Sequence, residues 1–379
     1  MHAWVSFVLP WLMMLPAWFA LAQQSSPKGA LMSDRDRAGL QGSVRSVLVE
    51  QRFSSPDGRQ LLTSTRTEYA PDGKTLEVRY NNSNGSVWTT TYVYQPNGNL
   101  VRTASGKAGA APSSEAAYSY DEAGRLVEVK SGGRTQARIE YDAKGRKSVI
   151  EGYDSKPLPP NTAYAAHWEG SDLGFAPYPG GSLTTSYNEQ DVATGAQLRD
   201  ADGKLVARIE RKFNEKGRVI SEQQIADAPE LMIPEEMKSK LSPEQVKSMG
   251  AFVAGGLNNR AISYVYDDHG RVTEQHKTGG AFGEEVIVTT YNDRGDKASE
   301  HTTTVMNPEV GRVYNLTESG AIIPKGQPQP AQPPSTYETQ YTYQYDSYGN
   351  WTEQSTVTRS RPDAPWQPGF SIRRKLSYY

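Results

Sequence analysis

Few residues of this sequence have the type and spacing that chemistry requires. Its five histidines are His2, His167, His269, His276 and His301, and it contains no cysteine. Metal sites built from His and Cys need short, defined spacings between the ligands. His269 and His276 come nearest to such a spacing, but the strand pattern around them predicts that they lie far apart. The sequence therefore indicates no metal site and no cofactor.

Carboxylates are numerous, with 43 Asp and Glu residues, yet none forms an identifiable catalytic pair. They fall at turn positions or on polar strand faces, so a glycosidase-like acid pair cannot be singled out. The motifs of serine hydrolases, zinc peptidases, phosphate-binding loops and dinucleotide sites are absent. A repeated Asp-x-x-Gly lacks the dense oxygen ligands of a calcium site. We expect a protein that is not an enzyme, with a hydrolase as the least favoured alternative.

The strongest pattern is a repeat of an aromatic residue, three further residues, a glycine and a polar residue that is usually basic. Its copies are YAPDGK from Tyr69, YQPNGN from Tyr94, YDEAGR from Tyr120, YDAKGR from Tyr141, FNEKGR from Phe213, YDDHGR from Tyr266, YNDRGD from Tyr291 and YDSYGN from Tyr345. FSSPDGR from Phe53 and LRDADGK from Leu198 are looser copies. Uninterrupted neighbours lie about 21 to 26 residues apart, which is the period of a supersecondary unit.

The residue types predict that each copy is the tip of a β-hairpin. A short carboxylate at the first turn position can bond the backbone two residues on. A glycine at the fourth position supplies the left-handed conformation that closes a three-residue loop with a bulge. The carboxylates are Asp121, Asp142, Asp267 and Asp346, and the glycines are Gly124, Gly145, Gly217, Gly270, Gly295 and Gly349.

The segments before the tips alternate in character. Tyr341, Tyr343 and Tyr345 share one face of a strand, whereas Thr342 and Gln344 take the other. This alternation predicts antiparallel strands with one aromatic, buried face and one polar face.

With these copies in view, the sequence resembles the YD-repeat (RHS-repeat) family, whose hallmark Y-D-x-x-G-R-L is matched fully by YDEAGRLVEV from Tyr120. The resemblance covers residues 40–379 with interruptions. It implies an all-β fold in which repeated antiparallel β-hairpins form a long curled sheet, a partial shell or an open barrel. Large members enclose a toxin in a hollow shell. The core segment that ends those shells has no counterpart after Tyr345, so the chain is similar to the small exported bacterial branch.

Three stretches interrupt the repeat. Residues 153–181 form a Pro- and Gly-punctuated loop that carries candidate ligand-binding rings at Tyr164, Trp168, Phe175 and Tyr178. Long loops often carry function, although buried rings under loops are also ordinary. Residues 228–256 predict a short helical insertion that covers a sheet face or edge, with partner binding as the alternative. Residues 320–336 read as a Pro- and Gln-rich loop.

Residues 1–22 have the apolar run and the Ala20-Leu21-Ala22 site of a signal peptide, with an uncleaved anchor as the alternative. Residues 23–39 would then be a linker. A lipid-modified cysteine is excluded, so we expect a secreted or periplasmic protein without an integral membrane domain after cleavage. The net charge of −2 gives no reason to expect nucleic-acid binding.

These features predict an exported, non-enzymatic scaffold for interactions at the cell envelope or outside the cell. The alternative is a carbohydrate-binding module in which aromatic loop residues stack on sugar rings. Polysaccharide and envelope proteins are the partner classes that these two hypotheses imply. An exposed strand edge would also permit self-association.

Overall fold

The computed structural model describes residues 33–54, 60–152, 166–168, 171–175, 181–233, 235–254, 259–279, 283–306, 314–317, 322–324 and 333–379. Within these residues one 20-stranded antiparallel sheet dominates. Its first strands are β1 (Val44–Ser54), β2 (Gln60–Tyr69), β3 (Thr75–Asn81), β4 (Val87–Tyr94), β5 (Leu100–Lys107), β6 (Ser114–Tyr120), β7 (Leu126–Ser131), β8 (Arg134–Tyr141) and β9 (Lys147–Gly152).

The sheet continues through β12 (Ser182–Tyr187), β13 (Ala193–Arg199), β14 (Leu205–Phe213), β15 (Val219–Ala226), β16 (Arg260–Tyr266), β17 (Val272–Gly279), β18 (Glu284–Tyr291), β19 (Lys297–Val305), β22 (Ser335–Tyr345), β23 (Trp351–Arg359) and β24 (Gln367–Tyr378). Two small hairpins pair β10 (Ala166–His167) with β11 (Gly174–Phe175) and β20 (Tyr314–Leu316) with β21 (Ile322–Pro324). The helices are α2 (Asp34–Arg37), η1 (Pro229–Met232), α3 (Glu235–Lys238) and α4 (Pro243–Val253). The all-β prediction and the helical insertion are confirmed.

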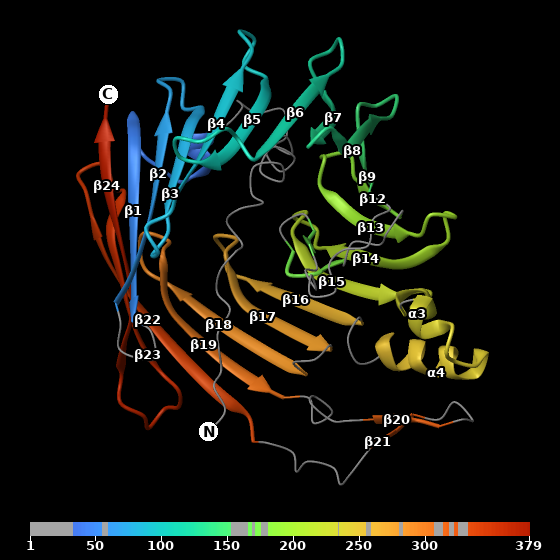
Figure 1. The fold of residues 1–379 in the computed structure, drawn as a ribbon. Coiled ribbons are helices and arrows are strands. Elements are labelled where there is room, and N and C mark those ends of the chain that lie inside the picture. The colour runs from blue at the N-terminus through green and yellow to red at the C-terminus, as the bar shows by residue number, and fades with distance from the viewer. Residues whose placement is uncertain are drawn as a thin grey trace.

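The sheet closes on itself (Figure 1). Each strand pairs with the strand before and after it, and β24 pairs antiparallel with β1 from Val44 opposite Tyr378 to Arg52 opposite Ser371. The expected partial shell or open barrel is therefore corrected to a closed barrel. Pairing the first strand with the last satisfies backbone groups that an open sheet would expose at both edges. Self-association through a free edge at β1 or β24 is accordingly not expected.

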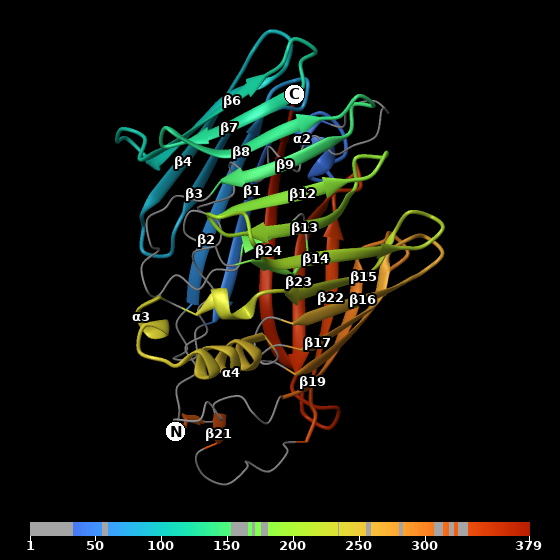
Figure 2. The same ribbon diagram turned by 90° about the vertical axis from the view of Figure 1, so that its right-hand side faces the viewer.

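The up-and-down order sorts every connection to one of two ends of the barrel. The turns after β2, β4, β6, β8, β12, β14, β16, β18 and β22 lie at one end, which we call the repeat rim. The connections after β9, β15 and β19 carry all three interruptions and leave from the opposite end, the insertion rim. In Figure 2, α3 and α4 lie at the ends of the strands remote from the turn between β14 and β15.

The repeat rim is built from interlocked copies of one unit. Its glycines have φ from +74° at Gly217 to +92° at Gly98, the conformation that the fourth turn position requires. The tip tyrosine of one unit donates to a carbonyl two residues after the glycine of the preceding unit. These bonds join Tyr94 to Thr75 (3.0 Å), Tyr120 to Leu100 (2.7 Å), Tyr141 to Leu126 (3.0 Å), Tyr266 to Val219 (2.6 Å) and Tyr291 to Val272 (2.8 Å).

The basic residue that follows the glycine links the units a second time. Arg125 donates from Nε to Oδ2 of Asp121 at 2.8 Å, and its guanidinium lies 4.3 Å from the ring centroid of Tyr141 in the next unit. Arg271 makes the same pair of contacts with Asp267 and Tyr291. The repeated Tyr-Asp-x-x-Gly-Arg is thus explained as a two-sided connector between neighbouring hairpins.

A seam cluster holds the two ends of the chain together. The side-chain amide of Asn350, which is 3% exposed, accepts from the Gln41 N–H at 2.6 Å and donates to the Gln41 carbonyl at 2.9 Å and to the Tyr378 hydroxyl at 3.0 Å. The Tyr348 ring stacks on Tyr378 with centroids 4.5 Å apart. Asn350, the residue after the glycine of the last repeat unit, thus joins that unit to the segment just before β1 and to the last strand.

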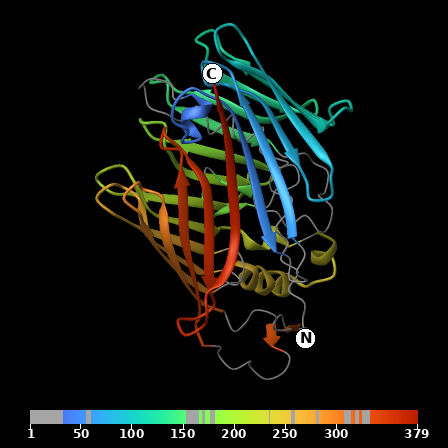
Figure 3. The same ribbon diagram turned by 90° about the vertical axis from the view of Figure 1, so that its left-hand side faces the viewer.

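Part of the predicted N-terminal linker is ordered. Ser33 forms a capping box with Asp36 at the start of α2, and the Arg35 N–H donates to the Gly73 carbonyl at the first repeat tip. Asp34 accepts from the Thr75 N–H at 2.7 Å. Figures 2 and 3 show this short helix beside the C-terminal end of β24.

Candidate functional site

The described part of the first insertion docks on the face of the sheet that carries the tip tyrosines, here called the tyrosine face. Trp168 is 1% exposed, and its Nε1 donates to Oγ1 of Thr185 on β12 at 2.9 Å. The guanidinium of Arg211 lies 4.3 Å from the Trp168 ring centroid. Leu173 joins Trp168 in a buried cluster with apolar residues of β12 to β16. Burial of this indole anchors the insertion to the barrel wall.

A buried carboxylate lies beside this anchor. Glu222 on β15 is 2% exposed and accepts from Arg211 Nε at 2.7 Å, from the Ser171 hydroxyl at 2.8 Å and from the Tyr264 hydroxyl at 2.6 Å. A buried charge is tolerated only when it is paired and hydrogen-bonded. Three donors from three parts of the chain meet this requirement, so Glu222 fixes the insertion to β14 and β16.

The electrostatics favour a permanent hydrogen bond over proton transfer. Burial raises the pKa of Tyr264 well above its usual range, and the hydrogen bond to the Glu222 carboxylate raises it further. The phenol therefore remains protonated and continues to donate near neutral pH. We describe the arrangement as a latch, defined as Trp168, Ser171, Arg211, Glu222 and Tyr264.

The edge of the latch is more exposed and is held by charge. Asp172 pairs with Nζ of Lys277 on β17 at 2.7 Å, and its carbonyl accepts from Nη2 of Arg260 at 3.3 Å. Lys277 also lies 3.3 Å from a carboxylate oxygen of Glu285 on β18. The first insertion thus contacts successive strands from β12 to β17.

The other two insertions contact each other. The helix α4 begins at a capping box between Ser242 and Gln245, and Nε2 of Gln245 also donates to the carbonyl of Thr317 at 2.6 Å. The helix packs against η1, which in turn packs on β14 and pairs Glu230 with Lys204 at 3.1 Å. Figure 1 shows α4 near β20 and β21. Segments from separate interruptions therefore form one assembly at the insertion rim.

The predicted ligand-binding rings have different positions. Trp168 is a core residue: the ring is covered by Arg211 and the apolar cluster, which agrees with the alternative of a ring buried under the loop and leaves no exposed face for stacking on a ligand. The backbone of Phe175 belongs to β11, but its side chain lies outside the described residues, as do Tyr164 and Tyr178. Binding by these three rings stays a prediction.

Sequence reasoning missed the latch charges, although a signal was present. Arg211 follows Ala207 and Ile209 on one face of β14, where a strand face that is otherwise buried acquires a charge. A charge on a buried face requires a partner. Glu222, opposite Arg211 in the register of β14 and β15, is that partner.

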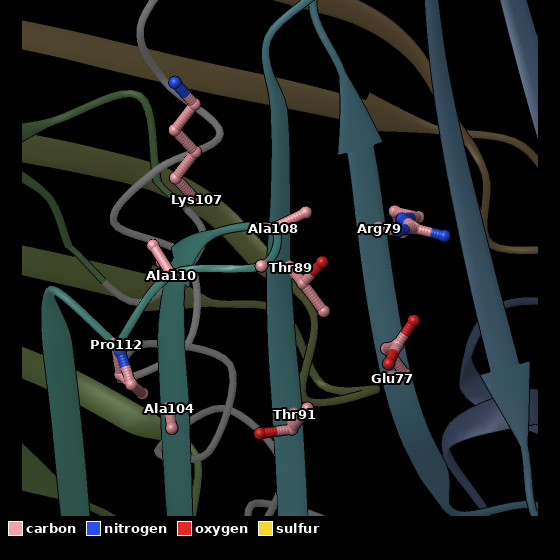
Figure 4. A pocket seen from close by; sticks show the side chains of 11 residues that line it. Glu77, Arg79, Thr89, Thr91, Ala104, Lys107, Ala108, Ala110 and Pro112 are labelled. Atoms are coloured by element: carbon pink, nitrogen blue, oxygen red, sulfur yellow. The ribbon is translucent and has the colours of Figure 1, made fainter.

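A shallow groove of about 360 Å³ lies across β3, β4 and β5 (Figure 4). Glu77, Arg79, Thr89 and Thr91 line one part, and Ala108, Gly109, Ala110 and Pro112 line the other. These strand residues belong to the sheet face opposite the tip tyrosines. The lining holds no pairing of nucleophile and base, so the groove has no evident chemistry.

The described residues contain no group of three or more His, Cys, Asp or Glu side chains placed to hold a metal ion. No helix in the described part of the chain is long and apolar enough to cross a membrane.

Comparisons with known proteins leave the family unassigned. No protein-family model matches the sequence, and no curated protein matches it. Among solved structures, a porin-like protein from Bacteroides uniformis is similar over 88% of this chain and 96% of its own, with 11% identity and a TM-score of 0.30. The Tc holotoxin pore of Photorhabdus luminescens is similar over 85% of this chain but 18% of its own, with 12% identity and a TM-score of 0.23. A porin-like protein from Bacteroides vulgatus has 10% identity and a TM-score of 0.22. Scores this low support no inference about fold or function.

Proposed function

We propose that this protein is an exported, non-enzymatic YD-repeat scaffold that binds its partner through the insertion rim. The observation that carries this proposal is the sorting of the connections. All three interruptions of the repeat leave from one end of the barrel, whereas the other end is a series of near-identical turns. Binding surfaces are commonly built from variable loops on a rigid scaffold.

The hydrogen bonds made by the buried charged and hydroxyl groups support a binding role rather than a catalytic one. The buried carboxylate of Glu222 accepts hydrogen bonds from the Tyr264 hydroxyl and from Arg211, so these groups hold the fold. The tip tyrosines likewise donate to carbonyls of neighbouring units. Functional groups that are fixed in this way position an insertion but do not attack a substrate.

Site-specific photo-crosslinking in the cell that exports the protein tests the proposal. Crosslinkers are placed at Met237 and Lys247 on the insertion rim, and at Glu122 and Lys216 on the repeat rim as matched exposed controls. Adducts of one defined size that form from the insertion rim alone support the proposal. Equal adducts from both rims, or adducts from the repeat rim alone, contradict it.

Carbohydrate binding is a second candidate, and one exposed ring favours it. Tyr337 lies on the same face of β22 as Tyr341 and Tyr343 but is 49% exposed. Exposed tyrosine rings can stack on apolar faces of sugars, whereas Tyr69 and Tyr118, at 5% and 4% exposed, cannot. A glycan array with residues 23–379 tests this candidate. Binding lost in Tyr337→Ala and kept in Thr342→Ala supports it, and no binding by the folded protein excludes it.

A further inference from the structure

Two arginines at the seam leave a donor without an acceptor. Within the described residues, Nε of Arg35 and Nε of Arg374 are buried and have no hydrogen-bond partner; the third such atom, Nε of Arg260, belongs to the latch edge. Buried polar groups in proteins are almost always satisfied, so an orphaned donor calls for an explanation such as a bound ion or water. Here two of them border the same cluster.

Both arginines lie beside the buried cluster that contains Tyr69. Arg35 donates from Nη1 to the Val44 carbonyl at 3.4 Å, and Val44 and Tyr69 belong to one buried cluster. Leu376, two residues beyond Arg374 on the same face of β24, packs against that cluster. Both arginines act electrostatically on the Tyr69 hydroxyl. Sequence positions 35, 69 and 374 are thus gathered where the barrel closes.

The orientation and charge of the Arg374 guanidinium suit it to binding an anion. Its guanidinium lies 3.4 Å from the Trp351 ring centroid, which fixes the plane of the group and leaves its edge for hydrogen bonds. Burial lowers its pKa to about 10, so it remains charged at neutral pH. No ion pair of Arg374 with a carboxylate occurs within the described residues, whereas its neighbour Arg373 pairs with Glu353 at 3.2 Å.

The carboxylates near these two arginines already accept hydrogen bonds from other groups. Asp34 accepts from the Thr75 N–H and the Tyr94 hydroxyl and pairs with Arg37. Asp296 accepts from the Tyr345 hydroxyl at 2.6 Å. These carboxylates reduce the local positive charge, yet they do not bond to either orphaned Nε.

We propose that Arg35, Arg374 and Tyr69 form a binding site for a small oxyanion, a carboxylate or a phosphate, at the seam of the barrel. Two guanidinium groups and a phenol supply the donors that such oxygens accept. Because the donors come from α2, β2 and β24, a bound anion would join the N-terminal segment to the last strand. This site is independent of the insertion rim.

Isothermal titration with sodium phosphate and with sodium acetate, at ionic strength held constant with sodium chloride, tests the proposal. We expect saturable binding of at least one of the two anions, and a loss of affinity of about tenfold or more in Arg374→Gln. Arg373→Gln is the matched control, since it removes the adjacent charge on the opposite face, and it should leave the affinity unchanged. Binding of phosphate but not acetate would assign a phosphate group, and the reverse would assign a carboxylate.

A second variant guards against a folding defect in Arg374→Gln. Tyr69→Phe keeps the ring in the cluster and removes one donor, and it should weaken binding several-fold. The proposal is overturned if the folded wild type binds neither anion saturably, or if Tyr69→Phe and a folded Arg374→Gln both bind as the wild type does. Water would then account for the orphaned donors.

Discussion

The two rims of the barrel use the same strands in opposite ways. At the repeat rim several units hold the next through the same pair of contacts, a tyrosine hydroxyl on a carbonyl and an arginine on an aromatic ring. At the insertion rim the contacts are individual, such as Glu222 with three donors and Gln245 with Thr317. The repeated contacts at the repeat rim stabilise the barrel, so the connections at the insertion rim can differ from one another. For this reason we assign partner binding to the insertions.

The largest effect should come from the anchor of the first insertion. Trp168→Ala removes a buried indole that holds β12 and the latch, and we expect a loss of about 3 to 5 kcal/mol of unfolding free energy. Denaturant unfolding monitored by circular dichroism measures it. A change below about 1 kcal/mol would show that the insertion is not anchored as described.

The closing unit should be nearly as sensitive. Asn350→Ala removes a buried amide that bonds both Gln41 backbone groups and the Tyr378 hydroxyl, and we expect a loss of about 2 to 3 kcal/mol of unfolding free energy. Asn99, the residue after Gly98 at another tip, is the matched control. Asn99→Ala should lower the free energy of unfolding by less than about 0.5 kcal/mol, because the Asn99 side chain makes no contacts comparable to those of Asn350. Equal losses in the same unfolding assay would contradict a special role for the seam.

A smaller effect with a defined pH dependence is expected for the tyrosine hydrogen bonds that link neighbouring repeat units. Tyr141→Phe removes one hydroxyl bond between units and should cost about 1 kcal/mol near neutral pH. Burial raises the pKa of Tyr141 to about 12 from an unfolded value of 10, so its contribution is complete below pH 10 and lost as the pH rises toward 12.

Unfolding experiments from pH 8 to pH 12 compare wild type with Tyr141→Phe. The difference between the two proteins should shrink above pH 10. A constant difference across this range would show that the hydroxyl is not held in the protonated form.

The smallest effect concerns a repeat unit that lacks its glycine. Asp191 has φ of +57° at the position that Gly occupies in other tips. Asp191→Gly should stabilise the protein by about 0.5 to 1 kcal/mol, and Gly217→Asp, made where the added side chain has open space, should destabilise it by a similar amount. Thermal unfolding resolves both changes, and a destabilising Asp191→Gly would refute strain at this turn.

The hairpin tips could be predicted because the residues that form each turn are adjacent in the sequence. The tip from Tyr187 was missed because Asp191 replaces the glycine, although Asn188 makes the same backbone bonds as the other tips: its carbonyl accepts from the Asp191 N–H, and its side chain accepts from the Val192 N–H. The looser copy from Leu198 belongs to the opposite rim, where Asp200 and Gly203 close the turn between β13 and β14. A pattern search cannot separate the rims, because both use similar turns.

Contacts between residues far apart in the sequence could not be predicted from local sequence patterns. Closure depends on β1 meeting β24 in register, and Asn350 meets Gln41 across 309 residues of sequence. Trp168 was a candidate ligand-binding ring with burial under the loop as the alternative, and the choice depended on a wall built from β12 to β16 that local sequence does not show. The tertiary context decided both outcomes.

The pairing of β1 with β24 closes the sheet into a barrel, and the absence of cysteine allows a direct test of it. Ser46 and Ser377 face each other in register with their hydroxyls 2.7 Å apart, so the double variant Ser46→Cys and Ser377→Cys should form an intramolecular disulfide. A second pair, Ser46→Cys with Ser221→Cys on β15, serves as the control. Near-complete oxidation of the first pair and none of the second, read by mass spectrometry of proteolytic fragments, is the predicted result. Free thiols in both folded variants after oxidation would contradict closure of the barrel.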